Sequence, residues 1–176
     1  MSQPSLHSWA EESLRLLDQT VAKDDPDPKA LACSGLLLRT ADDQPEEVWL
    51  RFVDGRPVSA ITVPFLADCC DRLAARGKTA LFLVWDNASW HGSTAVRRWI
   101  QEQNQQVKRE GHGVRIIACP LPIKAPWLNP IEPKWVHGKR AVVEPARLLS
   151  AAEVEERVCA YFGCHPQEHL MAQKAA

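Results

Sequence analysis

The chain has 176 residues, of which 45% are hydrophobic and 24% charged, and its formal net charge is -1. This composition is typical of a globular protein of one domain, and no apolar run is long enough to span a bilayer, which excludes a membrane protein. The N-terminus has no basic segment followed by an apolar one, and the six cysteines form no CxxC pair. We therefore expect a cytoplasmic protein with reduced, mostly buried thiols and no membrane partner.

The first half of the chain predicts two strands and a helix. Apolar and β-branched residues favour strands at 29–38 and 47–53, which an acidic turn joins. Apolar residues at helical spacing predict a helix over 63–77, with Gly77 as its C-terminal stop.

The second half predicts a βαβ unit and a final helix. The continuous apolar run "ALFLVW" at 80–85 is typical of a strand buried on both faces. A helix over 93–109 follows with Ser93 as N-cap, then a buried strand at 114–120, and an amphipathic helix at 150–163 closes the chain. Strand, helix and strand in succession predict an α/β fold with a partly parallel sheet.

Charge is distributed unevenly along these elements. Residues 87–147 carry 10 Lys/Arg and 4 Asp/Glu, whereas residues 1–86 carry 9 Lys/Arg and 14 Asp/Glu. A basic middle segment indicates a surface for an anion, nucleic acid included, although solvated helix faces carry similar charge.

Asp86 follows directly after the apolar strand at 80–85. Its carboxylate is expected at the carboxyl end of that strand, where open α/β sheets place ligands and chemistry. The alternative is an ordinary turn residue that caps the loop "DNASWHGS".

Glu132 lies in the unusual stretch "APWLNPIEPKW" at 125–135. Asn129 as N-cap, proline at N1 and Glu132 at N3 would start a helix with a capping box. Trp127 and Trp135 are each expected in the core. A structural cap does not explain so rigid a setting, whereas an Asp and a Glu that converge could hold Mg²⁺ for phosphoryl transfer.

These motifs resemble a known family. "LVWDNASWH" followed by "LPIKAPWLNPIEPKW" is similar to the catalytic core of mariner-type DDE transposases of bacterial insertion sequences, over roughly residues 29–145. The resemblance implies an RNase H-like mixed sheet flanked by helices. It also implies metal-dependent cleavage and rejoining of DNA at the element's ends, with Mg²⁺ or Mn²⁺ in a two-metal site.

Carried over residue by residue, the resemblance makes Asp86 the second catalytic and metal-binding acid and Glu132 the third. Asn87 and His91 match polar positions beside the second acid, and Asn129 precedes the proline of the third motif. DNA phosphates would be bound by basic residues within and after these motifs: Arg97, Arg98, Lys124, Lys134, Lys139 and Arg140.

The family's first Asp, on the opening strand of its sheet, has no counterpart before residue 29. We therefore expect residues 1–176 to be one partial catalytic domain that is N-terminally truncated, lacks the first strand and has no helix-turn-helix region. Asp24, Asp25 and Asp27 are the nearest acids, but "KDDPDPK" is typical of a solvated turn. A separate N-terminal fragment or a second copy in a homodimer could complete the site.

Three functional hypotheses follow. The first is a DDE transposase catalytic domain whose activity depends on the missing acid. The second is a non-catalytic DNA-binding remnant of such a transposase. The third is an unrelated α/β binding domain in which Asp86 is a turn residue and Glu132 a helix cap.

Overall fold

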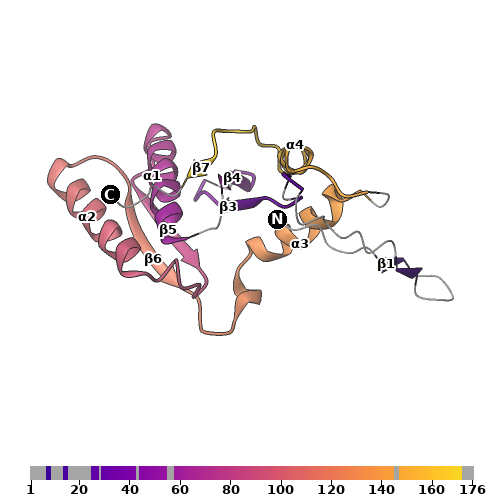
Figure 1. The fold of residues 1–176 in the computed structure, drawn as a ribbon. Helices are drawn as coiled ribbons and strands as arrows, with labels where there is room; N and C mark the ends of the chain where they lie inside the picture. Colours follow the sequence, from indigo (N-terminus) through magenta and orange to yellow (C-terminus); the bar gives the residue numbers. More distant parts are fainter. Residues whose placement is uncertain are drawn as a thin grey trace. The chain divides into compact units, whose positions relative to one another are not determined.

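The computed structural model describes residues 7–8, 14–15, 25–27, 29–42, 44–54, 58–144 and 147–171 (Figure 1). It divides into two compact units. The first unit comprises Met1–Phe52 and Pro133–His169, and the second comprises Val53–Glu132 and Leu170–Ala176. In the described residues the elements form a mixed α/β fold, as the sequence predicts.

The longer elements of the first unit are two strands and two helices. The strands β3 (Ala32–Leu38) and β4 (Glu47–Asp54) are neighbours in a sheet of order β3-β4-β7, and α3 (Ile131–Val142) and α4 (Ala151–Phe162) follow late in the chain. Residues in or next to these strands and helices form its core: Leu31, Leu50, Phe52, Val142, Leu149, Val154, Val158 and Cys159. Burial of these side chains is the main force that joins β3 and β4 to helices about 100 residues later.

The core of the first unit is packed without spare room around Gly35. A Cβ added at Gly35 would lie 2.5 Å from Cζ2 of Trp135 and 2.9 Å from Cδ2 of Leu50. Trp135 also meets Phe162 edge to face, with ring centroids 5.5 Å apart. Trp135 is therefore packed against the core, as the sequence predicts, and glycine at position 35 permits that contact.

The N-terminus of α4 is fixed by three side chains. Ser150 and Glu153 form a reciprocal capping box, and both carboxylate oxygens of Asp27 accept from the backbone N–H of Ala151 at 3.0 and 3.1 Å. The terminal N–H groups of α4 thus obtain acceptors from the chain itself.

The second unit contains the βαβ unit. Its elements are α1 (Ser59–Ala75), β5 (Ala80–Trp85), α2 (Thr94–Glu110), β6 (Arg115–Pro120), the short 3₁₀ helix η1 (Pro126–Leu128) and β7 (Leu170–Met171). The strands β5 and β6 are parallel, in a register that pairs Ala80 with Arg115 and Trp85 with Pro120. The last residues of β4 pair with β7, also in parallel. The parallel pairing confirms the βαβ prediction.

Burial within β5 and β6 differs from the expectation. Leu81, Leu83 and Ile116 are buried, but Phe82 is 68% exposed and Ile117 is 40% exposed. Side chains alternate across a sheet, and α2 packs on β6 while α1 packs on α2, so helices of this unit cover one face. The prediction of strands buried on both faces is wrong within the described residues.

The helix α1 begins earlier than expected. The sequence predicts a start at residue 63, which would place Pro64 in the first turn, whereas the helix starts at Ser59 and contains Pro64. Ile61 and Thr62 are buried, so the apolar face extends a turn further. At the other end Gly77 has φ +69° and donates to the Ala74 carbonyl, which confirms the expected stop.

The remaining described elements are two short strands, β1 (His7–Ser8) and β2 (Leu14–Arg15), which pair antiparallel. All six cysteines are free; Cys69, Cys70 and Cys159 are buried and the other three are partly buried. Burial raises the pKa of the Cys70 thiol to about 11, which keeps it protonated. No described helix has the length and apolarity needed to cross a membrane.

Candidate active site

Asp86 lies at the carboxyl end of β5, where the sequence places it. β5 ends at Trp85, whose carbonyl accepts from the N–H of Leu121 at 2.9 Å, so pairing with the chain beyond β6 continues to this point. The Oδ1 atom of Asp86 accepts from the backbone N–H of Ala88 at 3.0 Å. Asp86 is therefore also the turn residue of the alternative interpretation, because this bond shapes the start of the loop.

His91 reaches the same carboxylate oxygen. Its Nδ1 atom lies 2.8 Å from Oδ1 of Asp86, and the imidazole stacks on Trp85 with centroids 5.1 Å apart and an angle of 6°. Trp90 meets the imidazole edge to face at 5.9 Å. The stacking partner Trp85 was not predicted, since its position at the end of an apolar strand resembles that of any core residue.

One oxygen of Asp86 makes no hydrogen bond in the described residues. Both hydrogen bonds use Oδ1, the side chain is 41% exposed, and nothing in the described part of the chain donates to Oδ2. With Nδ1–H donating to Asp86, the Nε2 atom of His91 is an acceptor in the neutral imidazole. Asp86 is thus oriented by its neighbours and retains an oxygen for a ligand.

Asn87 connects the loops that follow the two parallel strands. Its Nδ2 atom donates to the carbonyl of Leu121 at 2.6 Å, across 34 positions of sequence. The loop that carries Asp86 and His91 is thereby tied to the start of the loop that leads to Glu132. The sequence singles out Asn87, but its acceptor is a backbone carbonyl that no sequence motif indicates.

Glu132 lies in the first turn of α3 and is half-buried. Its N–H donates to the carbonyl of Asn129 at 3.1 Å, and α3 begins at Ile131, two residues beyond Asn129. No hydrogen bond involves the side chain of Asn129 or the carboxylate of Glu132 in the described residues, so the capping box expected from the sequence is absent there. The Glu132 carboxylate is available for a ligand, and the helix N-terminus favours an anion at this position.

Trp127 contradicts the expectation of a core position. It lies in η1 and is 74% exposed, and its neighbours Leu128 and Ile123 are 51% and 79% exposed. Ala125 and Ile131, on either side, are buried and anchor the loop. Buried and exposed residues follow each other in this loop without a regular period, so hydrophobic periodicity could not predict which of them are buried.

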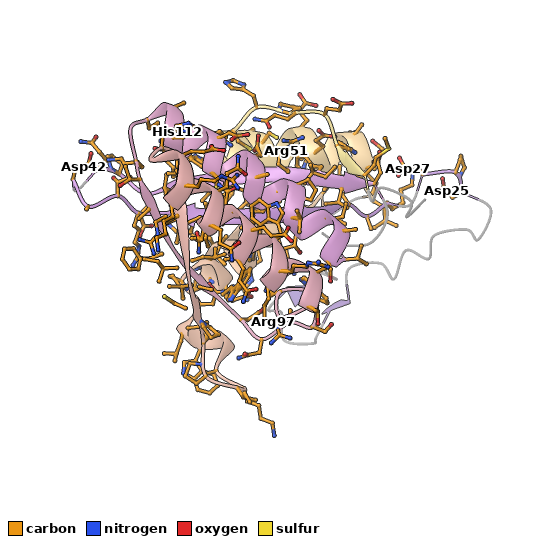
Figure 2. The ribbon with its side chains drawn as sticks, turned by 90° about the vertical axis from the view of Figure 1, so that its left-hand side faces the viewer. Asp25, Asp27, Asp42, Arg51, Arg97 and His112 are labelled. Carbon is orange, nitrogen blue, oxygen red and sulfur yellow. The ribbon has the colours of Figure 1, made fainter. Side chains whose placement is uncertain are left out.

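The predicted DNA-binding residues of the second unit are on its surface. Arg97 and Arg98 lie in the first turns of α2, and Figure 2 shows Arg97 near one end of that helix and His112 beyond the other. Arg98 pairs with Glu102 at 3.1 Å, four residues along the helix. Lys124 is exposed and has φ +60°. These placements are compatible both with phosphate contacts and with an ordinary solvated helix face.

The basic residues of α3 differ in their surroundings. Lys134 is 2.8 Å from Glu46, which also pairs with Arg39, and these two cations hold the pKa of the Glu46 carboxyl below its ordinary value. Lys139 and Arg140 are exposed in the last turn, where cations stabilise the helix dipole. Lys134 thus already has an anionic partner.

The nearest acids before β3 have structural roles. Asp27 accepts from Ala151 and from Lys29, and Asp25 accepts from the N–H of Asp27 (Figure 2). Within the described residues of "KDDPDPK" the chain bends at Pro26 and Asp27, as the predicted turn requires; Asp24 lies outside the described residues, as does most of the stretch 2–10 apart from β1. Across the described part of the chain no group of three or more His, Cys, Asp or Glu could hold a metal ion.

Comparison with known proteins identifies the family. A family model described as DDE superfamily endonuclease matches residues 40–155, more than half of the chain, and the match contains Asp86, His91 and Glu132. The chain belongs to the DDE superfamily endonucleases. No curated protein and no solved structure is detectably similar to it.

Membership indicates a transposase-like nuclease that acts on DNA, in a superfamily that generally uses divalent metals. Carboxylate oxygens are the hard donors that Mg²⁺ and Mn²⁺ prefer, and neither Oδ2 of Asp86 nor the carboxylate of Glu132 has a hydrogen-bond partner in the described residues. Mg²⁺ commonly binds through one or two protein carboxylates together with substrate phosphates. The two carboxylates are thus of the donor type that such an ion takes.

Proposed function

We propose that the chain is the catalytic domain, over residues 1–176, of a mariner-type transposase that acts in the bacterial cytoplasm. It would cut and rejoin DNA at the ends of an insertion sequence. The observation that carries this proposal is the state of Asp86, whose partly exposed side chain is held through Oδ1 at the end of a parallel strand while Oδ2 makes no hydrogen bond in the described residues.

Asp86 and Glu132 are the proposed ligands for Mg²⁺ or Mn²⁺. When bound, such ions activate the attacking oxygen and stabilise the leaving oxygen in phosphoryl transfer. The chain's own residues position the ligands: His91 and the N–H of Ala88 orient Asp86, and Asn87 ties its loop to the chain that leads to Glu132. Asn129 supports Glu132 through its backbone carbonyl.

A third carboxylate would enter beside β5. This strand has β6 on one side, and no described strand pairs with its other edge. A strand added there in parallel would end close to Asp86 and could bring an acid to it. We propose that this strand comes from a segment outside the described residues, from a separate N-terminal fragment or from a second copy.

Basic side chains would hold the DNA backbone. Arg97, Arg98 and Lys124 in the second unit, and Lys139 and Arg140 on α3, are exposed and can contact phosphates. Lys134 would contribute less, because it is paired with Glu46. Such contacts give affinity that is independent of sequence and weakens with salt.

Nicking of supercoiled plasmid DNA tests the proposal. We expect the purified chain, supplied if necessary with the strand that completes β5, to nick the plasmid with Mg²⁺ or Mn²⁺ and not with a chelator. Asp86→Asn and Glu132→Gln should each reduce nicking by at least roughly 100-fold, because each removes a ligand charge from the site.

Matched controls are Asp71→Asn and Glu156→Gln, which change the same functional groups at exposed positions of α1 and α4. Both should nick DNA like the wild type. DNA binding without metal-dependent nicking, with or without the added strand, would support instead a non-catalytic DNA-binding remnant. Nicking that survives in both site variants would refute the assignment of Asp86 and Glu132.

A further inference from the structure

Trp127 is the most unusual surface residue of the second unit. An indole that is 74% exposed leaves a large apolar surface in water, although tryptophan is usually mostly buried. Trp127 is not exposed because its loop lacks regular structure; the loop backbone is hydrogen-bonded. Ala125 donates to the Pro122 carbonyl at 3.2 Å, Leu128 donates to the Ala125 carbonyl at 3.1 Å, and Ala125 itself is buried. The backbone therefore presents Trp127 outward from a defined turn.

This turn lies on the loop between β6 and α3. The loop starts at Leu121, whose carbonyl accepts from Asn87 next to Asp86, and it ends where α3 begins, one residue before Glu132. Trp127 is five positions before Glu132, in the same segment. The exposed ring of Trp127 thus lies in the segment that directly precedes Glu132.

Trp90, which is also exposed, differs from Trp127 because its ring contacts another side chain. Trp90 is 38% exposed and meets His91 edge to face, so it packs within the loop that carries Asp86. No ring contact involves Trp127 in the described part of the chain, and its faces can receive a planar partner.

The surroundings of Trp127 favour nucleic acid as that partner. Lys124, three positions earlier, is exposed, and the loop lies in the basic segment of the chain. An aromatic face beside a cation suits a nucleobase attached to a phosphate, because the base stacks while the cation binds the backbone. Interior base pairs of a duplex are already stacked on both faces, so an unpaired base offers Trp127 a face that they do not.

We propose that Trp127 stacks on an unpaired nucleobase of the DNA substrate next to the site of cleavage. This inference rests on the proposed function, and it names the form of DNA that the site prefers: a frayed or single-stranded end rather than an intact duplex. Ile123 and Leu128 are exposed apolar side chains of the same loop, but neither has a π face with which to stack.

Binding to matched DNAs tests the inference. Fluorescence anisotropy without divalent metal would compare a blunt duplex, the same duplex with a short single-stranded end, and that end with abasic nucleotides. We expect wild type to bind the single-stranded end more tightly than either other DNA. Trp127→Ala should weaken binding to that DNA by about 5- to 100-fold and leave binding to the blunt duplex nearly unchanged.

Trp127→Phe and Ile123→Ala serve as matched variants. Phenylalanine keeps an aromatic face and should retain most of the preference, and Ile123→Ala removes a comparably exposed apolar side chain of the same loop with little effect. An equal loss in Ile123→Ala would show a general apolar contact and overturn stacking.

The remaining outcomes separate this inference from the proposed function. A wild type that binds all three DNAs equally refutes the stacking role but leaves the nuclease proposal standing. Absence of binding to any DNA refutes both. A change in self-association on sedimentation of Trp127→Ala, with the preference for single-stranded ends unchanged, would assign Trp127 to a protein interface and refute stacking.

Discussion

Asp86 makes both of its hydrogen bonds through Oδ1, to the Ala88 N–H and to His91. A carboxylate held at one oxygen has a defined orientation, and its other oxygen can bind a cation without losing these bonds. The stack of His91 on Trp85 fixes the imidazole in turn. We therefore regard His91 as a positioning residue that acts through Asp86.

Replacement of His91 by alanine tests this role. We expect His91→Ala to lower metal-dependent nicking and Mn²⁺ affinity by roughly 10- to 100-fold, because groups that orient a metal ligand typically contribute that much. The thermal unfolding midpoint should change little, since His91 is a partly exposed loop residue.

The control for this prediction is His112→Ala, which removes an imidazole whose side chain is 80% exposed beyond the end of α2 (Figure 2). It should behave like wild type in both assays. Unchanged Mn²⁺ affinity in His91→Ala would contradict a positioning role.

At the scale of single residues the sequence was informative about chemistry and less so about burial. Asp86 was placed at the end of β5 because a polar residue directly follows an apolar strand, which is a local signal. Trp127 was expected in the core because tryptophan usually is, and its exposure depends on which loop residues anchor. Here Ala125 and Ile131 are buried and anchor the loop, whereas Ile123 is exposed, and residue type alone does not distinguish the buried from the exposed residues.

Among the elements, the strand pair β5–β6 has two different edges. On the outer side of β6, the side chain of Asn104 from α2 both donates to the Ile116 carbonyl and accepts from the Ile116 N–H, each at 2.8 Å. One amide thereby satisfies the outward groups of Ile116 and obstructs the approach of another strand at that edge. No side-chain bond of this kind is made on the other edge of β5 in the described residues. The protected edge and the open edge together support strand addition at β5.

Loss of the amide should expose the outer edge. We expect Asn104→Ala to lower the free energy of unfolding by about 1–3 kcal/mol, because the Ile116 backbone groups lose their partners while partly buried. It should also increase concentration-dependent self-association, measured by light scattering.

Gln105→Ala is the matched control, since Gln105 is an exposed amide on the next position of α2. It should change neither quantity. An Asn104→Ala variant that remains monomeric and as stable as wild type would contradict the protective role of this side chain.

Element types and several ends were predictable because their signals are local. Ser93 accepts from the Val96 N–H as an N-cap, and Ser150 begins α4 with a capping box. Burial could not be predicted from local sequence in the same way. The apolar run that forms β5 has one covered and one exposed face, because α1 and α2 pack on a single side. The pairing of β4 with β7 joins residues over 100 positions apart, and a strand of two residues has no periodic signal.

For the molecule as a whole, the relevant fact is that one compact unit contains both proposed ligands. Asp86 and Glu132 both belong to the second unit, and the family match covers the entire stretch between them. The first unit contributes most of α3, in which Trp135 packs against the core three residues after Glu132. We propose that these two carboxylates bind a divalent ion together.

Electron paramagnetic resonance of Mn²⁺ would test whether they share an ion, with binding measured in wild type, Asp86→Asn, Glu132→Gln and the double variant. We expect each single variant to bind Mn²⁺ at least about 10-fold more weakly, and the double variant to lose much less than the product of the two single losses. Such non-additivity arises when two groups share one ion. Affinities that stay unchanged in either single variant, or losses that multiply in the double variant, would contradict a shared site.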